Sequence, residues 1–437
     1  MLLLYALAIP LILTMNPLLS VVGISILSYF GSVYMIPRAS ESFISIGLFG
    51  RDRLKVSDQK IPESLGTVVG IIYIFAVTIL TSFTLRVDAL VAYLSGILSI
   101  QSMVMLGFAD DLFDLRWRHK FFLPAIASIP LLLVYYVEHG VTTIVVPYYG
   151  PIDLGWLYYI YMASLAIFAT NCINIYAGVN GLEVGQSIVV VCSVIANDLL
   201  YLFHDAFIGS LQPDTVRAHT LPLFFVVPLL SVSLALIKFN WFPAKIFVGD
   251  AYCYFAGMVL AVAGITGHFS KTMLSLIMPQ IINFLYSFPQ LLKIVPCPRH
   301  RMPLMKDGLL YPSRADITDS PGSILVIMKV LKKLKLIEIY QTELSSTDSK
   351  HEIDQIENDS TDVDATKATK NAASKTNPTK KIEISNMTVI TLVLVHKGPI
   401  TEEELTRTLI KIQVICCVMA LLARHVLAKL IFPNDNI

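Results

Sequence analysis

Apolar runs of about 20 residues constrain the fold of this chain more than any other feature of its sequence. A helix of that length crosses a hydrocarbon layer about 30 Å thick. Because backbone groups in lipid must be paired within the chain, such runs predict membrane-spanning helices. We expect ten spans, at residues 9–35, 66–85, 88–107, 121–137, 156–172, 183–203, 218–238, 252–267, 273–293 and 408–431.

The composition is that of a membrane protein, and it argues against nucleic-acid binding, a zinc site and a disulfide-stabilised fold. Of the 437 residues, 55% are hydrophobic and 15% are charged, whereas about a quarter of a soluble domain is charged. The net charge of +1 gives no bulk field that would favour nucleic acid. The six cysteines form no C-x-x-C pair, so neither a zinc site nor a disulfide framework is indicated.

The tenth span has a weaker pattern than the others. Lys411, Gln413, Arg424 and Lys429 interrupt or crowd it, so an amphipathic surface helix is the alternative. Arg424 and Lys429 also sit near the end of this span that should be non-cytoplasmic, against the orientation that the other loops favour.

The loops between the spans alternate between two sides. One side carries ten Lys or Arg residues in its short loops and span edges, and the other carries three. The positive-inside rule makes the richer side cytoplasmic. The cytoplasmic loops are then 37–65, 108–120, 173–182, 239–251 and 294–407.

The fold class is therefore an all-α polytopic membrane protein with a small cytoplasmic α/β appendage between the ninth and tenth spans. Residues 1–293 form a nine-helix core, 294–407 the cytoplasmic loop, and 408–437 the last span and tail. The runs Ser323–Met328 and Met387–Val395 are β-branched and strand-like. Residues 345–385 are polar and poor in large apolar side chains, which predicts a disordered insert.

An acidic segment follows the third span. Asp110 and Asp114 are four residues apart, so a continuing helix places them on one face, with Asp111 beside them. Carboxylates at a membrane edge attract a hard divalent cation, and Mg²⁺ takes a few carboxylates together with phosphate oxygens. Lys120 and the arginines before it suit a polyphosphate, although a solvated acidic loop balanced by these cations is an equal alternative.

Two further polar segments lie at span ends. Asn171 and Asn174 are three residues apart, and buried amides need a metal, a substrate or each other as partner, unless they belong to an ordinary cap and turn. Asp250 opens the eighth span, where it either caps the helix or faces a ligand. Phe247 either stacks on a base or anchors at the membrane interface.

The segment after the ninth span is basic. Its prolines hold it extended, which sends Arg299 and Arg301 to one side and His300 to the other. Paired guanidiniums grip a diphosphate, but a basic membrane flank explains them too. Glu63, taken by itself, is explained as an acidic residue in the first turn of a helix.

All these segments fall on one predicted side of the membrane. Together they provide carboxylates for a cation, basic side chains for a diphosphate and an aromatic ring that can stack on a base. That combination suits transfer of a phosphorylated group from a nucleotide diphosphate to a lipid acceptor, catalysed by positioning and charge stabilisation.

Four motifs carry a resemblance to a known family: FADDLFDLRWRHK, NxxNIYAGxNGLE, FPAKIFVGDAYCYFAGM and PCPRHRMP. With them the chain resembles the eukaryotic UDP-N-acetylglucosamine–dolichyl-phosphate N-acetylglucosaminephosphotransferases, a branch of the polyprenyl-phosphate sugar-1-phosphate transferase superfamily. Bacterial phospho-MurNAc-pentapeptide translocases carry a histidine-rich motif where this chain has Arg299, His300 and Arg301, which favours a GlcNAc donor here.

The resemblance implies a role for each candidate residue. Asp110, Asp111, Lys120 and Asp250 would be catalytic, and Asn174 and Asp250 would bind Mg²⁺. Within the substrate site, Glu63, Asn180 and Phe247 would hold uridine. The full set of substrate-binding residues would be Glu63, Trp117, Lys120, Asn180, Phe247, Arg299, His300 and Arg301.

The resemblance also implies transfer of GlcNAc-1-phosphate from UDP-GlcNAc to dolichyl phosphate with release of UMP, the first step of lipid-linked oligosaccharide assembly for N-glycosylation. The enzyme would be a tunicamycin-sensitive homodimer in the endoplasmic reticulum membrane, with its site facing the cytosol and the next glycosyltransferase as a partner. Rival interpretations are another sugar-phosphate donor or polyprenol, a secondary transporter, and a catalytically silent scaffold.

Overall fold

A computed structural model describes residues 8–12, 14, 16–52, 59–84, 87–138, 140–146, 149–208, 213–297, 302–318, 320–343 and 380–427. The chain forms two compact units. The first consists of Met1–Phe284 and Glu402–Ile437, and the second of Leu285–Thr401. The last helix therefore belongs to the first unit although it follows the second unit in sequence.

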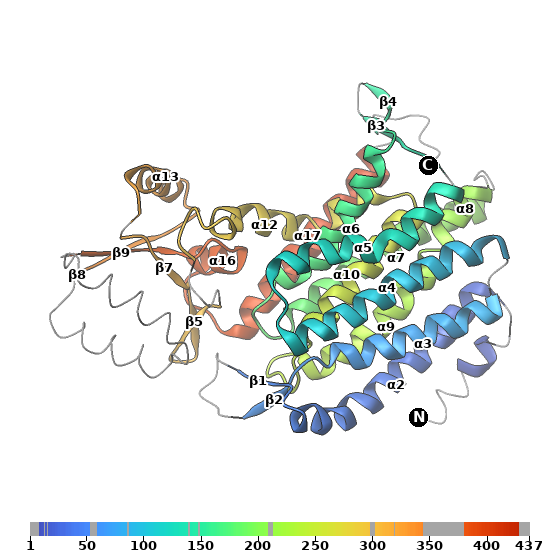
Figure 1. Ribbon diagram of the computed structural model, residues 1–437, viewed down its shortest axis with the longest axis horizontal. Helices are drawn as coiled ribbons and strands as arrows, with labels where there is room; N and C mark the ends of the chain where they lie inside the picture. The colour runs from blue at the N-terminus through green and yellow to red at the C-terminus, as the bar shows by residue number, and fades with distance from the viewer. Residues whose placement is uncertain are drawn as a thin grey trace. The chain divides into compact units, whose positions relative to one another are not determined.

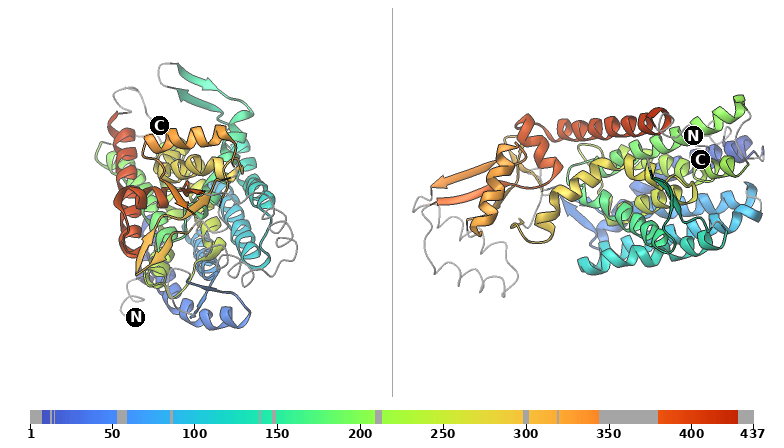
Figure 2. Two further views of the ribbon diagram at one scale, coloured as in Figure 1. Left: turned by 90° about the vertical axis from the view of Figure 1, so that its left-hand side faces the viewer. Right: turned by 90° about the horizontal axis from the view of Figure 1, so that it is seen from above.

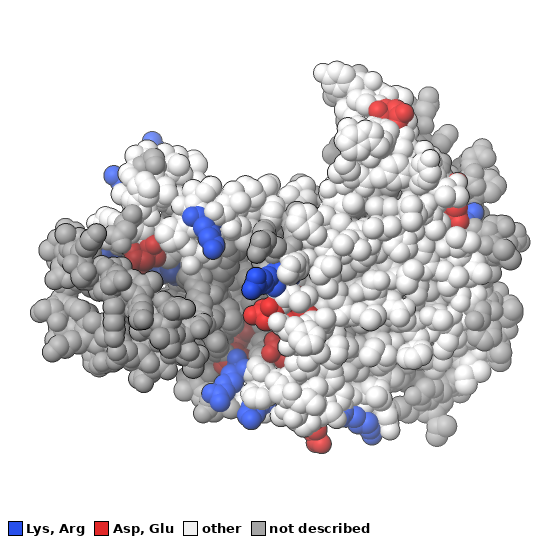
Figure 3. Space-filling view, viewed as in Figure 1, with Lys and Arg blue, Asp and Glu red and all other residues white. Residues whose placement is uncertain are grey.

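Apolar helices lie side by side in the first unit (Figure 1). Within the described residues, seven helices are long and apolar enough to cross a membrane, and Gly66–Thr81 and Phe122–Glu138 are shorter apolar helices. In Figure 3 the described surface along the bundle is nearly free of charged side chains, which gather toward its ends. The main helices are α2 (Pro17–Ser45), α3 (Gly66–Thr84), α4 (Val87–Phe113), α5 (Trp117–Glu138), α6 (Leu157–Ile175), α7 (Leu182–Ile208), α8 (Pro213–Thr220), α9 (Leu223–Asn240), α10 (Gly249–Thr266), α11 (Ser270–Leu276), α12 (Met278–Leu291) and α17 (Glu402–Leu422).

Every predicted span coincides with helix over most of its length, but the first, seventh and ninth are not continuous. The break in the ninth is the clearest. This span consists of α11 and α12, which are separated at Ile277. Pro279 explains the break, because it has no backbone N–H with which to continue the hydrogen bonds of α11. The total of ten spans stays a prediction.

Helix α10 forms the centre of the bundle and brings the neighbouring helices close. Glycines make this possible. A Cβ on Gly107 of α4 would lie 2.5 Å from the Cα of Ala251, and one on Gly257 would collide with the carbonyl oxygen of Ala169 in α6. With no side chain at either glycine, α4 and α6 approach the α10 backbone directly, and the polar ends of all three helices are held together.

Helix α17 packs along α7 and α11, and Figure 2 shows it in red beside the bundle. Gln413, which weakened the sequence pattern, is fully buried and donates to the carbonyl oxygen of Leu276 at 2.8 Å. At the end of the helix, the Arg424 guanidinium lies 5.8 Å from the centre of the Tyr201 ring. Two of the polar residues that interrupt this span, Gln413 and Arg424, thus have partners inside the bundle, as expected of polar groups in lipid.

Short antiparallel hairpins connect helices of the first unit. Strand β1 (Phe49–Arg51) pairs with β2 (Lys60–Pro62), and β3 (Thr143–Val146) pairs with β4 (Gly150–Asp153). The β1–β2 hairpin lies between α2 and α3 in sequence and precedes Glu63 directly.

The second unit has mixed helices and strands. Its three-stranded sheet has the order β7 (Arg314–Asp316), β9 (Lys380–Ser385) and β8 (Ile339–Glu343), all antiparallel. A separate hairpin joins β5 (Leu304–Lys306) to β6 (Leu309–Tyr311). Its helices are α13 (Gly322–Lys333) and α16 (Val389–Lys397).

Two sequence predictions about this unit are wrong. The runs Ser323–Met328 and Met387–Val395 are mainly helical, within α13 and α16. In α13 the less exposed side chains recur at helical spacing, with Ile324 and Met328 packed against the small core of the unit. The predicted disordered insert overlaps β9, the central strand, and residues 344–379 lie outside the described part of the chain.

Candidate active site

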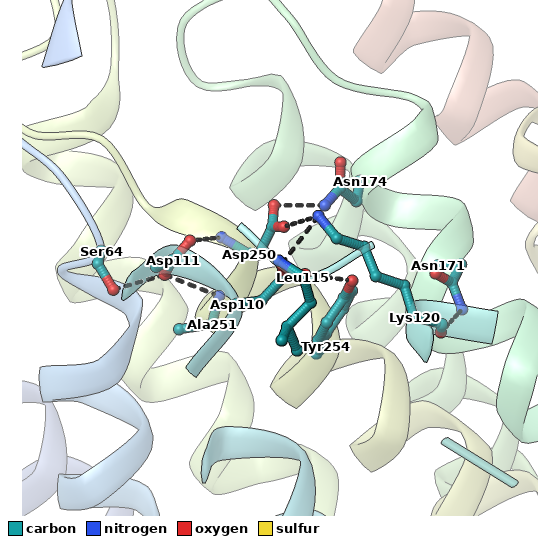
Figure 4. Close-up of polar contacts among 10 residues, drawn as sticks. All are labelled: Ser64, Asp110, Asp111, Leu115, Lys120, Asn171, Asn174, Asp250, Ala251 and Tyr254. Carbon is teal, nitrogen blue, oxygen red and sulfur yellow. Dashed lines mark hydrogen bonds and ion pairs between the residues drawn. The ribbon is translucent and has the colours of Figure 1, made fainter. Parts of the chain in front are cut away.

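Four helix ends meet around one ammonium group (Figure 4). Lys120, in the first turn of α5, places its Nζ 2.9 Å from Oδ1 of Asp110 and 3.3 Å from Oδ2 of Asp250. Asp110 comes from the last turn of α4 and Asp250 from the first turn of α10. The buried Asp110 is held further by Tyr254, whose hydroxyl donates to Oδ2 at 2.8 Å.

Asp111 points away from Lys120 and binds the backbone at the start of α10 (Figure 4). Its carboxylate accepts from the backbone N–H groups of Asp250 at 2.7 Å and Ala251 at 3.2 Å, and from Oγ of Ser64 at 2.5 Å. These two N–H groups are among those that an α-helix leaves without partners at its N-terminus. Asp111 therefore caps α10 from another helix and fixes where Asp250 stands.

This geometry decides between the two sequence interpretations of Asp250. The N-cap position is occupied by Val248, and Asp250 lies inside the first turn, so capping is not its role. Its Oδ1 instead accepts from Nδ2 of Asn174 at 2.5 Å. Asn171 makes no hydrogen bond with Asp250; its amide donates to the carbonyl oxygen of Ile167 at 2.9 Å and to the backbone carbonyl oxygen of Lys120 at 3.4 Å.

Electrostatics keep Lys120 charged. Burial by itself would lower the pKa of Lys120, but the hydrogen bond with Asp110 and the charge of Asp250 outweigh burial and raise that pKa. The pKa of Glu63 is also raised, first by burial and then by the negative charge of Asp111. Two carboxylates, those of Asp110 and Asp250, thus share the ammonium of Lys120, and Asp111 lies beside them, so this part of the site is acidic overall.

The predicted uridine residues gather along β1 and the residue after it. A Cβ on Gly50 would lie 3.0 Å from the Phe247 ring and 3.3 Å from Oε2 of Glu63. Asn180 is buried, and its Nδ2 donates to Oδ2 of Asp52 at 3.1 Å. The segment Gly50–Asp52 therefore links residues that are far apart in sequence.

Of the remaining predicted residues, only the side chain of Asp114 can be placed, and it does not join this group. Asp114 is exposed and has a φ of 46°, because α4 ends at Phe113, so the continuing helix that would align it with Asp110 is wrong. Trp117 begins α5, but its side chain lies outside the described part of the chain. Arg299, His300 and Arg301 lie outside the described residues as well.

The donor set suits Mg²⁺ in type. Asp110 and Asp250 supply carboxylate oxygens and Asn174 an amide, and the ammonium between the two carboxylates shows that the position attracts a cation. Among the described residues, no three Asp, Glu, His or Cys side chains form a metal site by themselves. This fits an ion that takes one or two carboxylates and completes its shell with water and substrate phosphates.

A cavity of about 680 Å³ lies at the other end of the helices. Its walls include Glu138 at the end of α5 and Thr266 at the end of α10. Lys120 and Glu138 are 18 residues apart on one helix, about 27 Å at 1.5 Å per residue. The cavity is therefore distinct from the polar site.

Comparison with known proteins identifies the family. A sequence model of glycosyl transferase family 4 matches residues 93–268. The UDP-N-acetylglucosamine–dolichyl-phosphate N-acetylglucosaminephosphotransferase of Saccharomyces cerevisiae is 44% identical over 97% of this chain and 94% of its own length. This chain belongs to the UDP-N-acetylglucosamine–dolichyl-phosphate N-acetylglucosaminephosphotransferase family. The Schizosaccharomyces pombe member is 40% identical over 97% of this chain and 95% of its own length, and the Dictyostelium discoideum member 42% identical over 62% and 72%.

Membership in this phosphotransferase family confirms the resemblance drawn from the four motifs. We call Lys120, Asp110, Asp250, Asn174 and Tyr254 the Lys120 group. The matched range contains every residue of this group but not Glu63. Sequence reasoning missed Ser64, Tyr254 and Asp52. Tyr254 follows Asp250 by four residues, so it lies on the same helical face, and that spacing could have found it.

Proposed function

We propose that this chain transfers GlcNAc-1-phosphate from UDP-GlcNAc to dolichyl phosphate, giving GlcNAc-diphosphodolichol and UMP. The observation that carries the proposal is the ammonium of Lys120 between Asp110 and Asp250, at the polar end of a bundle of membrane-type helices. Relatives whose sequences match nearly the whole chain are named for this reaction.

The charge of the site supports a requirement for a divalent cation. A nucleotide diphosphate and a lipid phosphate would bring further negative charge to a site where two carboxylates face one ammonium and a third, Asp111, lies close by. Asp250 and Asn174 would hold Mg²⁺ there, and the ion would neutralise phosphate charge as bound metals do in phosphoryl transfer. Arg299 and Arg301 would add positive charge on the diphosphate.

The reaction exchanges one phosphoanhydride for another. An oxygen of dolichyl phosphate attacks the β-phosphorus of UDP-GlcNAc, the bond from that phosphorus to the bridging oxygen breaks, and UMP leaves. The acceptor oxygen is already ionised at neutral pH, so a strong general base is not needed. Lys120 stays protonated because of its carboxylate neighbours, and its positive charge stabilises the negative charge of the reacting phosphates.

The cellular setting follows from the same proposal. The polar end of the bundle faces the cytosol, as the excess of Lys and Arg in the loops on that side predicts. The enzyme works as a homodimer in the endoplasmic reticulum membrane, and it associates with the next glycosyltransferase, which uses its product.

A transfer assay tests the reaction. Purified protein receives UDP-GlcNAc labelled in the sugar and dolichyl phosphate, and lipid-extractable label and UMP are measured in parallel, with Mg²⁺ or with EDTA, and with tunicamycin. We expect equal amounts of both products, only with Mg²⁺, and inhibition by tunicamycin. UMP without labelled lipid would indicate hydrolysis, and solute flux without UMP would indicate a transporter.

A further inference from the structure

The turn between α6 and α7 is fastened by a helix more than 200 residues away in the chain. Oε1 of Glu402, in the first turn of α17, accepts from the backbone N–H of Asn180 at 2.7 Å. Oγ1 of Thr406, one turn later, donates to the carbonyl oxygen of Asn180 at 3.1 Å. Both backbone groups of this one residue are therefore bound by side chains four positions apart on a single helical face.

The same helix reaches the tryptophan that supports this turn. Gly181 has a φ of 80°, and a Cβ there would lie 2.8 Å from Cε3 of Trp241. Nε1 of Trp241 in turn donates to Oε1 of Glu403 at 3.4 Å. Only glycine fits so close to the indole in this backbone conformation, so Trp241 and α17 together fix the position of the turn.

Burial separates Glu402 from an ordinary acid at a helix start. Three glutamates occupy the first turn of α17, where negative charge stabilises the helix dipole. Glu404 does so from an exposed position, whereas Glu402 is 1% exposed. Burying a carboxylate is unfavourable unless hydrogen bonds compensate it, so the bond to Asn180 is the reason that Glu402 is placed inward.

We propose that Glu402 and Thr406 are positioning residues for the uridine part of UDP-GlcNAc and act through Asn180. The inference rests on the proposed function, which puts Asn180 at the nucleotide. Asp52 fixes the amide of Asn180, and α17 fixes its backbone, so the side chain is held at both ends. Loss of the α17 contacts lets the turn shift, which weakens nucleotide binding without touching the Lys120 group.

Steady-state kinetics separate this role from a general loss of structure. The variants are Glu402→Ala and Thr406→Val, with Glu404→Ala as a matched control on the exposed side of the same turn. We expect Glu402→Ala to raise the KM for UDP-GlcNAc about tenfold, equivalent to about 1.4 kcal/mol. The KM for dolichyl phosphate and kcat stay within about twofold, as uniform binding predicts. Glu402→Gln retains an acceptor oxygen and restores part of the affinity.

Hydrogen exchange of the full-length protein gives a readout that does not depend on activity. Backbone amides in the peptide that contains Asn180 should exchange faster in Glu402→Ala than in Glu404→Ala. Unchanged exchange and an unchanged KM for UDP-GlcNAc in both Glu402→Ala and Thr406→Val would overturn the inference, as would equal rises in the KM values of both substrates. If the wild-type protein binds no UDP-GlcNAc, both the proposed function and this inference fail. If the wild-type protein transfers normally and the variants do not differ from it, this inference alone fails.

Discussion

Replacing Asp111 with alanine tests whether neighbouring carboxylates in one motif have different tasks. Asp110 faces Lys120, whereas Asp111 accepts two backbone N–H groups at the start of α10 and the Ser64 hydroxyl. Asp111→Ala leaves those two N–H groups without their acceptor in a partly buried site. The main expected consequence is a less stable protein, with Asp250 displaced as a result.

The size of the effect follows from these contacts. A lost helix cap costs about 0.5–2 kcal/mol, and a buried donor left without a partner costs about 1–3 kcal/mol. For two donors, we expect a loss of roughly 2–4 kcal/mol in the free energy of unfolding. On the scaling of medium-sized domains, about 2–4 °C for each kcal/mol, this lowers the melting temperature by about 4–16 °C.

The assay heats purified protein in detergent and measures the fraction that remains monodisperse on size-exclusion chromatography. Asp114→Asn is the matched control, because Asp114 is exposed, lies in the same motif and has a φ of 46°, which Asn tolerates; its effect should stay within about 0.5 kcal/mol, as for most surface changes. If Asp111→Ala melts with the wild-type protein and Asp114→Asn, the capping role of Asp111 is refuted.

Three further predictions concern the site. Lys120→Met should lower kcat by about 10²–10³, measured as UMP release from the folded fraction, because one electrostatic contact to the reacting phosphates is lost; near-normal kcat would contradict this role. Gly249→Ala should destabilise the protein by more than about 1 kcal/mol in the heating assay, because Gly249 has a φ of 72° and a Cβ there would collide with the Asp111 carboxylate; wild-type melting would exclude the collision. EDTA should abolish labelled-lipid formation and added Mg²⁺ restore it; full activity in EDTA would remove the metal from the mechanism.

The sequence was sufficient to predict most of the helices of the bundle, because apolar length and composition are local properties. It was not sufficient in the second unit. The apolar run in α13 is short, and a short run fits a strand or a buried helix equally well. Only its packing on the small core, through Ile324 and Met328, makes it a helix.

The candidate site was predictable where spacing or a motif indicated it. Asp110, Lys120, Asn174 and Asp250 come together as the motifs predict. The division of labour between Asp110 and Asp111 was not predictable, because it depends on which side of α4 meets the start of α10. The contact of Glu402 with Asn180 spans 222 residues and has no local signature.

The most direct test of the proposed catalytic site is the transfer rate of purified Asp250→Ala. This change removes the carboxylate that faces Lys120 and Asn174 but keeps the backbone N–H that Asp111 binds, so the start of α10 is preserved. We predict that Asp250→Ala melts close to the wild-type temperature and forms no detectable GlcNAc-diphosphodolichol. Wild-type transfer by this folded variant would contradict the assignment of the catalytic site to the Lys120 group.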